Sequence, residues 1–131
     1  MIDICVNFLN RQLQADPEMV LSRAEESGVE GLVLCSTDLA MVAANIALCE
    51  LLGAAKNLQY RTTAGVHPHD ASTWDQHSHA QLIKLANNPL VCAIGECALD
   101  FNRNYSTQEE QIRAFQGQIE VAIEVNKPLF V

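Results

Sequence analysis

The chain has 131 residues, of which 49% are hydrophobic, so it is long enough for one globular domain with a sizeable core. Its net charge of −8 opposes the attraction to phosphates that most nucleic-acid-binding modules use. A metal-dependent hydrolase remains compatible with this charge, because bound divalent cations supply positive charge locally. Since no apolar run is long enough to span a bilayer and no leader pattern begins the chain, we expect no membrane segment and a cytoplasmic location.

Apolar runs with the pattern of β-strands alternate along the chain with stretches that have the pattern of α-helices. Strands are predicted, in chain order, at residues 2–6, 29–35, 59–66 and 90–97, with a fifth beginning at Pro128. Helices are predicted from Asp16 to Gly28, from Thr37 or Asp38 to Gly53, around Leu82 to Leu85, and from Ser106 to Asn126. A polar loop through Asp70 and Trp74 is predicted after the third strand.

Capping residues mark the ends of these helices. Asp16 can accept hydrogen bonds from the first turn, and Pro17 suits the first helical position. Ser106 and Glu109 have the spacing of a capping box at the start of the last helix. The buried face of that helix is predicted from apolar residues at helical spacing, namely Ile112, Phe115, Ile119, Ala122 and Ile123.

Successive strand and helix units predict an α/β fold with parallel strands. Length favours a small open sheet over a (β/α)₈ barrel, which typically takes about 250 residues. However, Asn7, Ser36, His67 and Glu96 each follow one of four consecutive strands, as functional residues do at the rim of a barrel. We therefore predict the N-terminal half of a TIM barrel, with about four to five parallel β-α units in one partial domain, residues 1–131.

Glu96 is the most informative residue, because its carboxylate interrupts a run suited to a buried strand. A buried carboxylate requires a partner, which is either a divalent cation at the barrel mouth or a cation such as Arg103 in a structural ion pair. If the strand continues through residue 97, Glu96 shares a face with Cys92 and Ile94. The residues alone leave both interpretations of Glu96 open.

His67 and His69 lie just beyond a predicted strand, with Pro68 stiffening the backbone between them. Such a pair can bind a metal or a phosphate, or can form hydrogen bonds within the loop. The five cysteines have no zinc-finger spacing, so we interpret them as reduced thiols. Cys35 in particular is predicted to be buried and inert, because its neighbours are apolar.

The chain resembles the TatD family of metal-dependent deoxyribonucleases, which belongs to the amidohydrolase-like TIM barrels. The resemblance rests on four segments, at residues 63–70 (Thr-Ala-Gly-Val-His-Pro-His-Asp), 93–101 (Ala-Ile-Gly-Glu-Cys-Ala-Leu-Asp-Phe), 108–111 (Gln-Glu-Glu-Gln) and 126–131 (Asn-Lys-Pro-Leu-Phe-Val). It implies that Glu96 binds a divalent metal ion, Mg, Mn or Zn, and that His67 and Asp100 are catalytic. It further implies that His67, His69 and Arg103 bind the substrate. DNA would be that substrate, and exonuclease action would be expected.

The chain departs from the family pattern at the first strand. The family's Asp-x-His-x-His motif corresponds to Asp3-Ile4-Cys5-Val6-Asn7, in which both histidines are replaced. Cys5 could bind a soft metal and Asn7 a hard one, or this part of the site could be weakened or absent.

The second departure is at the other end of the chain, because the family's Pro-Leu-x-Val-His segment continues to a histidine ligand just beyond the position of Val131. We therefore expect an N-terminal fragment of a nuclease. The alternative is a non-catalytic half-barrel that self-associates through exposed sheet edges as a scaffold or binding module. An open five-stranded sheet that binds a small phosphate ligand is the third possibility.

Overall fold

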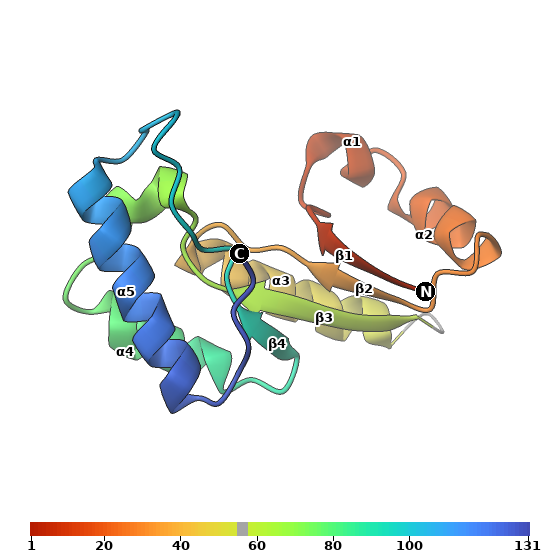
Figure 1. Ribbon diagram of the computed structural model, residues 1–131. Helices are drawn as coiled ribbons and strands as arrows, with labels where there is room; N and C mark the ends of the chain where they lie inside the picture. Colours follow the sequence, from red (N-terminus) through yellow and green to blue (C-terminus); the bar gives the residue numbers. More distant parts are fainter. Residues whose placement is uncertain (55–57) are drawn as a thin grey trace.

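The computed structural model describes residues 1–54 and 58–131, apart from the side chains of Gln12 and Gln14. Its single sheet has four parallel strands in the order β1-β2-β3-β4 (Figure 1). The strands are β1 (Ile2–Val6), β2 (Gly31–Leu34), β3 (Gln59–Ala64) and β4 (Val91–Ile94). The helices are α1 (Arg11–Gln14), α2 (Pro17–Glu26), α3 (Leu39–Gly53), η1 (Pro68–Thr73), α4 (Ser78–Ala86) and α5 (Gln108–Glu124).

Each strand pairs with the next strand along the chain, as in the first half of a (β/α)₈ barrel. The predicted α/β fold with parallel β-α units is therefore confirmed. The predicted fifth strand is present only as a parallel bridge between Ile94 and Leu129. The first strand, β1, lies at the edge of the sheet, and Ile2 and Ile4 there are about half exposed. Self-association through such an edge stays a prediction.

The caps at the starts of two helices match the sequence patterns. The Asp16 carboxylate accepts a hydrogen bond from Met19 N (3.1 Å), and the Asp38 carboxylate accepts one from Met41 N (2.7 Å). Gly28 adopts a positive φ of 82° just after α2, as expected of a residue that ends a helix. The N-terminal signals of α2 and α3 were therefore sufficient to locate these helices.

The start of α5 corrects the predicted capping box by one residue. Thr107 and Glu110 form the box, whereas Ser106 is buried and its hydroxyl donates to His69 O (2.9 Å). The predicted buried face is confirmed only in part, because Ala122 is buried and Phe115 and Ile119 are half-buried, whereas Ile112 and Ile123 are exposed. The residues that α5 buries are Gln111, Ala114, Gln118, Val121 and Ala122. Two glutamines can occupy this face because their amides pair with backbone groups of neighbouring segments.

Two further differences lie beside the carboxyl ends of the strands. The predicted loop through Asp70 is the 3₁₀ helix η1, and β4 ends at Ile94 instead of continuing to residue 97. Gly95 has a φ of 149°, and a Cβ there would lie 2.2 Å from Phe130 O. A residue with that conformation does not continue a strand, so Glu96 lies beyond β4, and the prediction that it shares a strand face with Ile94 is wrong.

The side chain of Gln118 joins α5 to the segment that follows β3 through two hydrogen bonds. Its side-chain oxygen accepts from Val66 N (2.8 Å), and its amide donates to Val66 O (3.0 Å). Gln118→Ala is expected to lower the free energy of unfolding by about 1–3 kcal/mol for each backbone group left unpaired in the interior. Urea unfolding would measure this loss. Gln116→Ala, on an exposed position of the same helix, is the control and should change stability by about 0.5 kcal/mol or less.

None of the helices in the two described ranges combines the length and the apolar character that crossing a bilayer would require.

Candidate active site

Backbone hydrogen bonds bring together the segments that follow β2, β3 and β4. The N–H of His67 donates to Thr37 O (2.8 Å), and the N–H of Glu96 donates to Ser36 O (3.0 Å). Two consecutive carbonyls after β2 therefore hold the two residues that the sequence singles out after β3 and β4. The side chain of Ser36 is also fixed, since its hydroxyl accepts from Asn45 Nδ2 at 3.0 Å.

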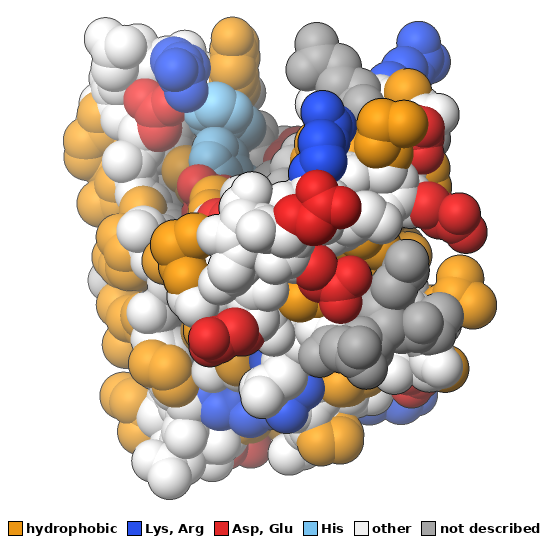
Figure 2. Space-filling view, turned by 90° about the vertical axis from the view of Figure 1, so that its right-hand side faces the viewer, with side chains coloured by type: hydrophobic (Ala, Val, Ile, Leu, Met, Phe, Trp, Pro, Cys, Tyr) orange, Lys and Arg blue, Asp and Glu red, His pale blue; other side chains and the backbone are white. Residues whose placement is uncertain are grey.

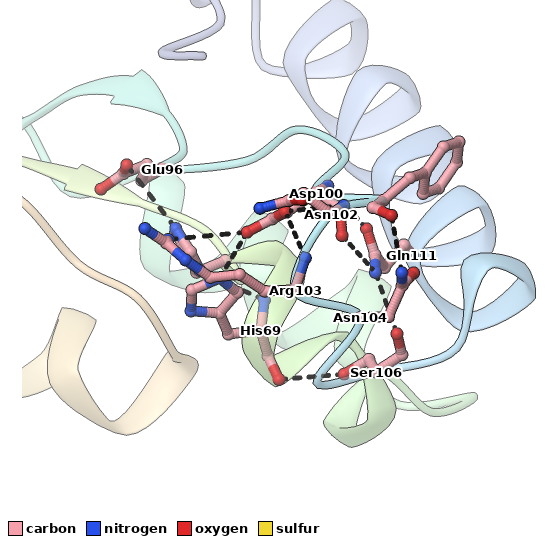
Figure 3. A network of polar contacts seen from close by, with 10 residues as sticks. His69, Glu96, Asp100, Asn102, Arg103, Asn104, Ser106 and Gln111 are labelled. Atoms are coloured by element: carbon pink, nitrogen blue, oxygen red, sulfur yellow. Dashed lines mark hydrogen bonds and ion pairs between the residues drawn. The ribbon is translucent and has the colours of Figure 1, made fainter.

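The side chains of His67 and Glu96 face each other across this end of the sheet. His67 Nε2 lies 3.7 Å from Glu96 Oε1, and Figure 3 shows the carboxylate turned toward a neighbouring imidazole ring. His67 Nδ1 accepts a hydrogen bond from His69 N (3.2 Å), so the proton of the neutral ring is on Nε2. Burial lowers the pKa of His67 below its ordinary value, although the Glu96 charge acts in the opposite direction. At neutral pH, His67 is therefore an uncharged donor aimed at the space beside Glu96.

Asp100 is the centre of a polar network in the loop between β4 and α5 (Figure 3). Its carboxylate accepts from Arg103 N (3.0 Å) and Asn102 N (3.1 Å), and it lies 2.8 Å from His69 Nε2. Because the Arg103 N–H and then the His69 ring stabilise the charged form, the pKa of Asp100 falls to about 2. The Arg103 guanidinium lies 3.6 Å from the same carboxylate. An ionised Asp100 thus holds both His69 and Arg103 in place.

The structure identifies Gln111, Ser106 and Tyr105 as further members of this network. The side chain of Gln111 accepts from Asp100 N (2.7 Å) and donates to Ser106 O (2.9 Å), which fixes the middle of the loop and its end before α5. Tyr105 packs edge-on against the His69 ring, with 4.7 Å between centroids. The 108–111 motif pointed to Gln111 as part of a family pattern, but only the fold shows its contact with Asp100. No sequence signal distinguishes Tyr105.

A second cluster joins Glu96 to two cysteines. The Cys5 and Cys35 sulfurs are 3.1 Å apart, and Cys5 Sγ lies 3.9 Å from Glu96 Oε2. The prediction that Cys35 is buried is confirmed, since 4% of the residue is exposed. Burial, together with the neighbouring Cys5 and Glu96, raises the pKa of Cys35 far above its ordinary value.

Asn7 lies in the turn after β1, where its carbonyl accepts from Asn10 N (3.1 Å).

All five residues named as site residues from the sequence therefore lie in one connected region: His67, His69, Glu96, Asp100 and Arg103. Among the described residues, Arg103 forms its ion pair with Asp100, which leaves the Glu96 carboxylate available to other partners. Figure 2 shows histidine side chains in a hollow at one end of the molecule, with charged side chains on its rim. The carboxylate and thiol donors around this region fit a divalent metal ion.

The sequence matches the model of the family described as TatD related DNase over residues 2–131. The chain belongs to this family. It is 44% identical over 131 residues to the 3'-5' ssDNA/RNA exonuclease TatD of Salmonella typhimurium, covering all of this chain and 48% of that protein. It is also 44% identical to the enzyme of the same name from Pectobacterium parmentieri, of which it covers 49%. The chain thus spans about half the length of the curated relatives that it matches.

Solved structures of TatD proteins share this fold. A TatD family hydrolase from Entamoeba histolytica superposes with a TM-score of 0.86 at 25% identity, over 95% of this chain and 46% of that one. A TatD homologue from Escherichia coli K12 superposes with a TM-score of 0.77 at 26% identity, over 98% of this chain and 49% of that one. The four β-α units therefore correspond to about half of each TatD structure, which confirms the predicted half-barrel.

Proposed function

We propose that the protein is a metal-dependent nuclease that removes nucleotides from single-stranded DNA or RNA, with Glu96 as a metal ligand. The observation that carries this proposal is the convergence of Glu96 and His67, 3.7 Å apart, at the carboxyl ends of neighbouring parallel strands. The relatives that match this chain over its whole length are named 3'-5' ssDNA/RNA exonucleases. Their names support single-stranded nucleic acid as the substrate and digestion from the 3' end. The cytoplasmic location stays a prediction.

A divalent ion bound at Glu96 would supply a Lewis acid and local positive charge to a chain whose net charge is −8. His67 would donate its Nε2 proton in a hydrogen bond to a phosphate oxygen, because its Nδ1 is already occupied. His69 and Arg103 would bind neighbouring phosphates. Asp100 would act as a positioning residue, because its carboxylate oxygens already contact the Asn102 and Arg103 amides and His69.

Digestion of a 5'-labelled single-stranded oligonucleotide, with and without Mg²⁺ or Mn²⁺, tests this proposal. We expect metal-dependent shortening from the 3' end for both DNA and RNA. An oligonucleotide whose 3'-terminal linkages are phosphorothioates should resist. Failure of the full-length protein to shorten either substrate at high enzyme concentration, with metal present, would contradict the proposal.

Arg103 provides a test of the substrate-binding role. Its side chain is 60% exposed and its guanidinium lies beside Asp100, so it can reach a phosphate without being required for the fold. Arg103→Ala should raise KM for single-stranded DNA about fivefold with little change in kcat. One charged contact of about 1 kcal/mol is lost equally from the bound substrate and from the bound transition state. Steady-state kinetics measure this split. Arg113→Ala, at an exposed position of α5, should leave both constants unchanged.

A further inference from the structure

The strongest unassigned feature is the group formed by Cys5, Cys35 and Glu96. Their ligand atoms all lie within 4.8 Å of one another. Cys5 belongs to β1, Cys35 follows β2 and Glu96 follows β4, so the sheet itself brings the three together. Cys35 lies in the interior, whereas Cys5 is exposed and the side chain of Glu96 is 32% exposed. The cluster therefore has a buried floor and is accessible from solvent.

The distances suit a tetrahedral metal ion with sulfur ligands. Zinc bound at about 2.3 Å by two thiolates separates the sulfurs by about 3.8 Å, and a carboxylate oxygen then lies about 3.6 Å from each sulfur. The observed separations are 3.1 Å between the sulfurs and 3.9 Å from Cys5 Sγ to Glu96 Oε2. Shifts of less than about 1 Å would bring the three ligands to that geometry.

The backbone at Cys5 adds a second observation. Cys5 has a φ of 65° at an irregularity in the pairing of β1 with β2. A side chain at a positive φ is disfavoured, and glycine would adopt this conformation more readily. Residues held in such conformations concentrate at functional sites, where another gain outweighs the cost. At Cys5 the gain would be a thiol placed against Cys35 and Glu96.

We propose that Cys5 and Cys35 are ligands of a divalent metal ion that Glu96 also binds, so that the site prefers zinc over magnesium. The proposal rests on the proposed function in taking Glu96 as a metal ligand. It places a thiolate, Cys5, where the family motif has its first histidine, and it adds Cys35, which lies outside that motif. Three protein ligands leave a fourth position open, as in catalytic zinc sites. Thiolates select zinc, whereas magnesium requires oxygen ligands.

Cobalt(II) absorption spectroscopy tests the ligands directly, because thiolate coordination gives an intense near-ultraviolet charge-transfer band. The reduced protein, kept in a phosphine reductant, should develop this band when Co²⁺ is added, and Zn²⁺ should abolish it. Cys5→Ser should lose about half of the band or more and weaken Zn²⁺ binding at least tenfold. Cys92→Ser, a half-buried cysteine whose thiol contacts Thr62 O, is the matched control and should keep both.

Cys35 is buried, so a serine there can disturb folding. The test therefore compares variants of Cys5 with the unsubstituted protein. Cys5→Gly relieves the positive φ and should fold with an equal or higher Tm, while losing about half of the band or more, as Cys5→Ser does. A Co²⁺ complex without a thiolate band in the unsubstituted protein, or a band of undiminished intensity in Cys5→Gly, would overturn the proposal.

The two proposals fail in different ways. If Mn²⁺-supported digestion requires Glu96 but no thiolate band forms, the cysteine ligands are wrong and the nuclease stands. If the band forms but the protein digests neither DNA nor RNA with any metal, the cysteine ligands stand and the nuclease is wrong.

Discussion

Glu96→Gln is expected to reduce metal-dependent digestion of single-stranded DNA by about 10²-fold or more, with the fold retained. Loss of a residue that only supports a metal ligand typically costs 10- to 100-fold, and removing the ligand should cost at least as much. The substitution keeps the size of the side chain, and the Glu96 N–H still donates to Ser36 O. Initial rates in Mn²⁺, together with isothermal titration of the metal, measure the effect.

Glu120→Gln is the matched control for this measurement. Glu120 is on α5, its side chain is 72% exposed, and its nearest charged partner is His79 at 3.9 Å. The same loss of one negative charge should leave the rate unchanged there. Equal rates for Glu96→Gln and the unsubstituted protein would exclude Glu96 as a metal ligand required for digestion.

Gly95→Ala is expected to be the most destabilising of the glycine-to-alanine substitutions. The residue has a φ of 149°, and an added Cβ would lie 2.2 Å from Phe130 O and 2.9 Å from Phe130 Cβ. Holding a non-glycine residue in such a conformation costs about 1–3 kcal/mol, and the overlap with the backbone adds to this cost. Denaturant unfolding should show a loss of about 3 kcal/mol or more, because neither segment can move without breaking the hydrogen bonds that join them, from Phe130 N to Ile94 O and from Cys97 N to Phe130 O.

Gly53→Ala is expected to raise the free energy of unfolding in the same experiment, whereas Gly95→Ala lowers it. Gly53 is the last residue of α3, and a Cβ there would meet nothing within 4 Å. Alanine should therefore stabilise the protein by about 0.5–1 kcal/mol through its higher helix propensity. If both glycine substitutions had the same small effect, the close approach of Gly95 to Phe130 would be wrong.

The order and type of the main elements could be predicted because local signals determine them. Asp16 and Asp38 cap helices through contacts with residues three positions away, and the alternation of strands and helices follows from hydrophobic pattern. The end of β4 could not be predicted in this way. It depends on Phe130, which is distant in sequence and occupies the space next to Gly95.

The buried face of α5 could be predicted only in part, for a related reason. Sequence patterns assign apolar residues to the interior, whereas this interior contains Gln111 and Gln118, whose amides pair with the backbones of Asp100 and Val66. These partners become visible only once the helix is placed against the loops. The short helix α1 was also missed, because four residues contain too little periodicity to be recognised.

The site residues could be named from their position after each strand, but their contacts could not. The sequence indicated Glu96 and His67 and, by resemblance, Asp100 and Arg103, and the fold brings them together. The sequence also indicated that Cys35 lies in the core, but it did not indicate which residue lies beside the Cys35 thiol. Only the pairing of β1 with β2 shows that a second thiol, Cys5, lies 3.1 Å away.

The carbonyls of Ser36 and Thr37 hold Glu96 and His67 through main-chain atoms alone. Every amino acid has such a carbonyl, so substitution at residue 37 can alter the surroundings of the site without removing the bond that positions His67. Related proteins could therefore vary their metal and substrate preferences at these positions while the framework of the site persists.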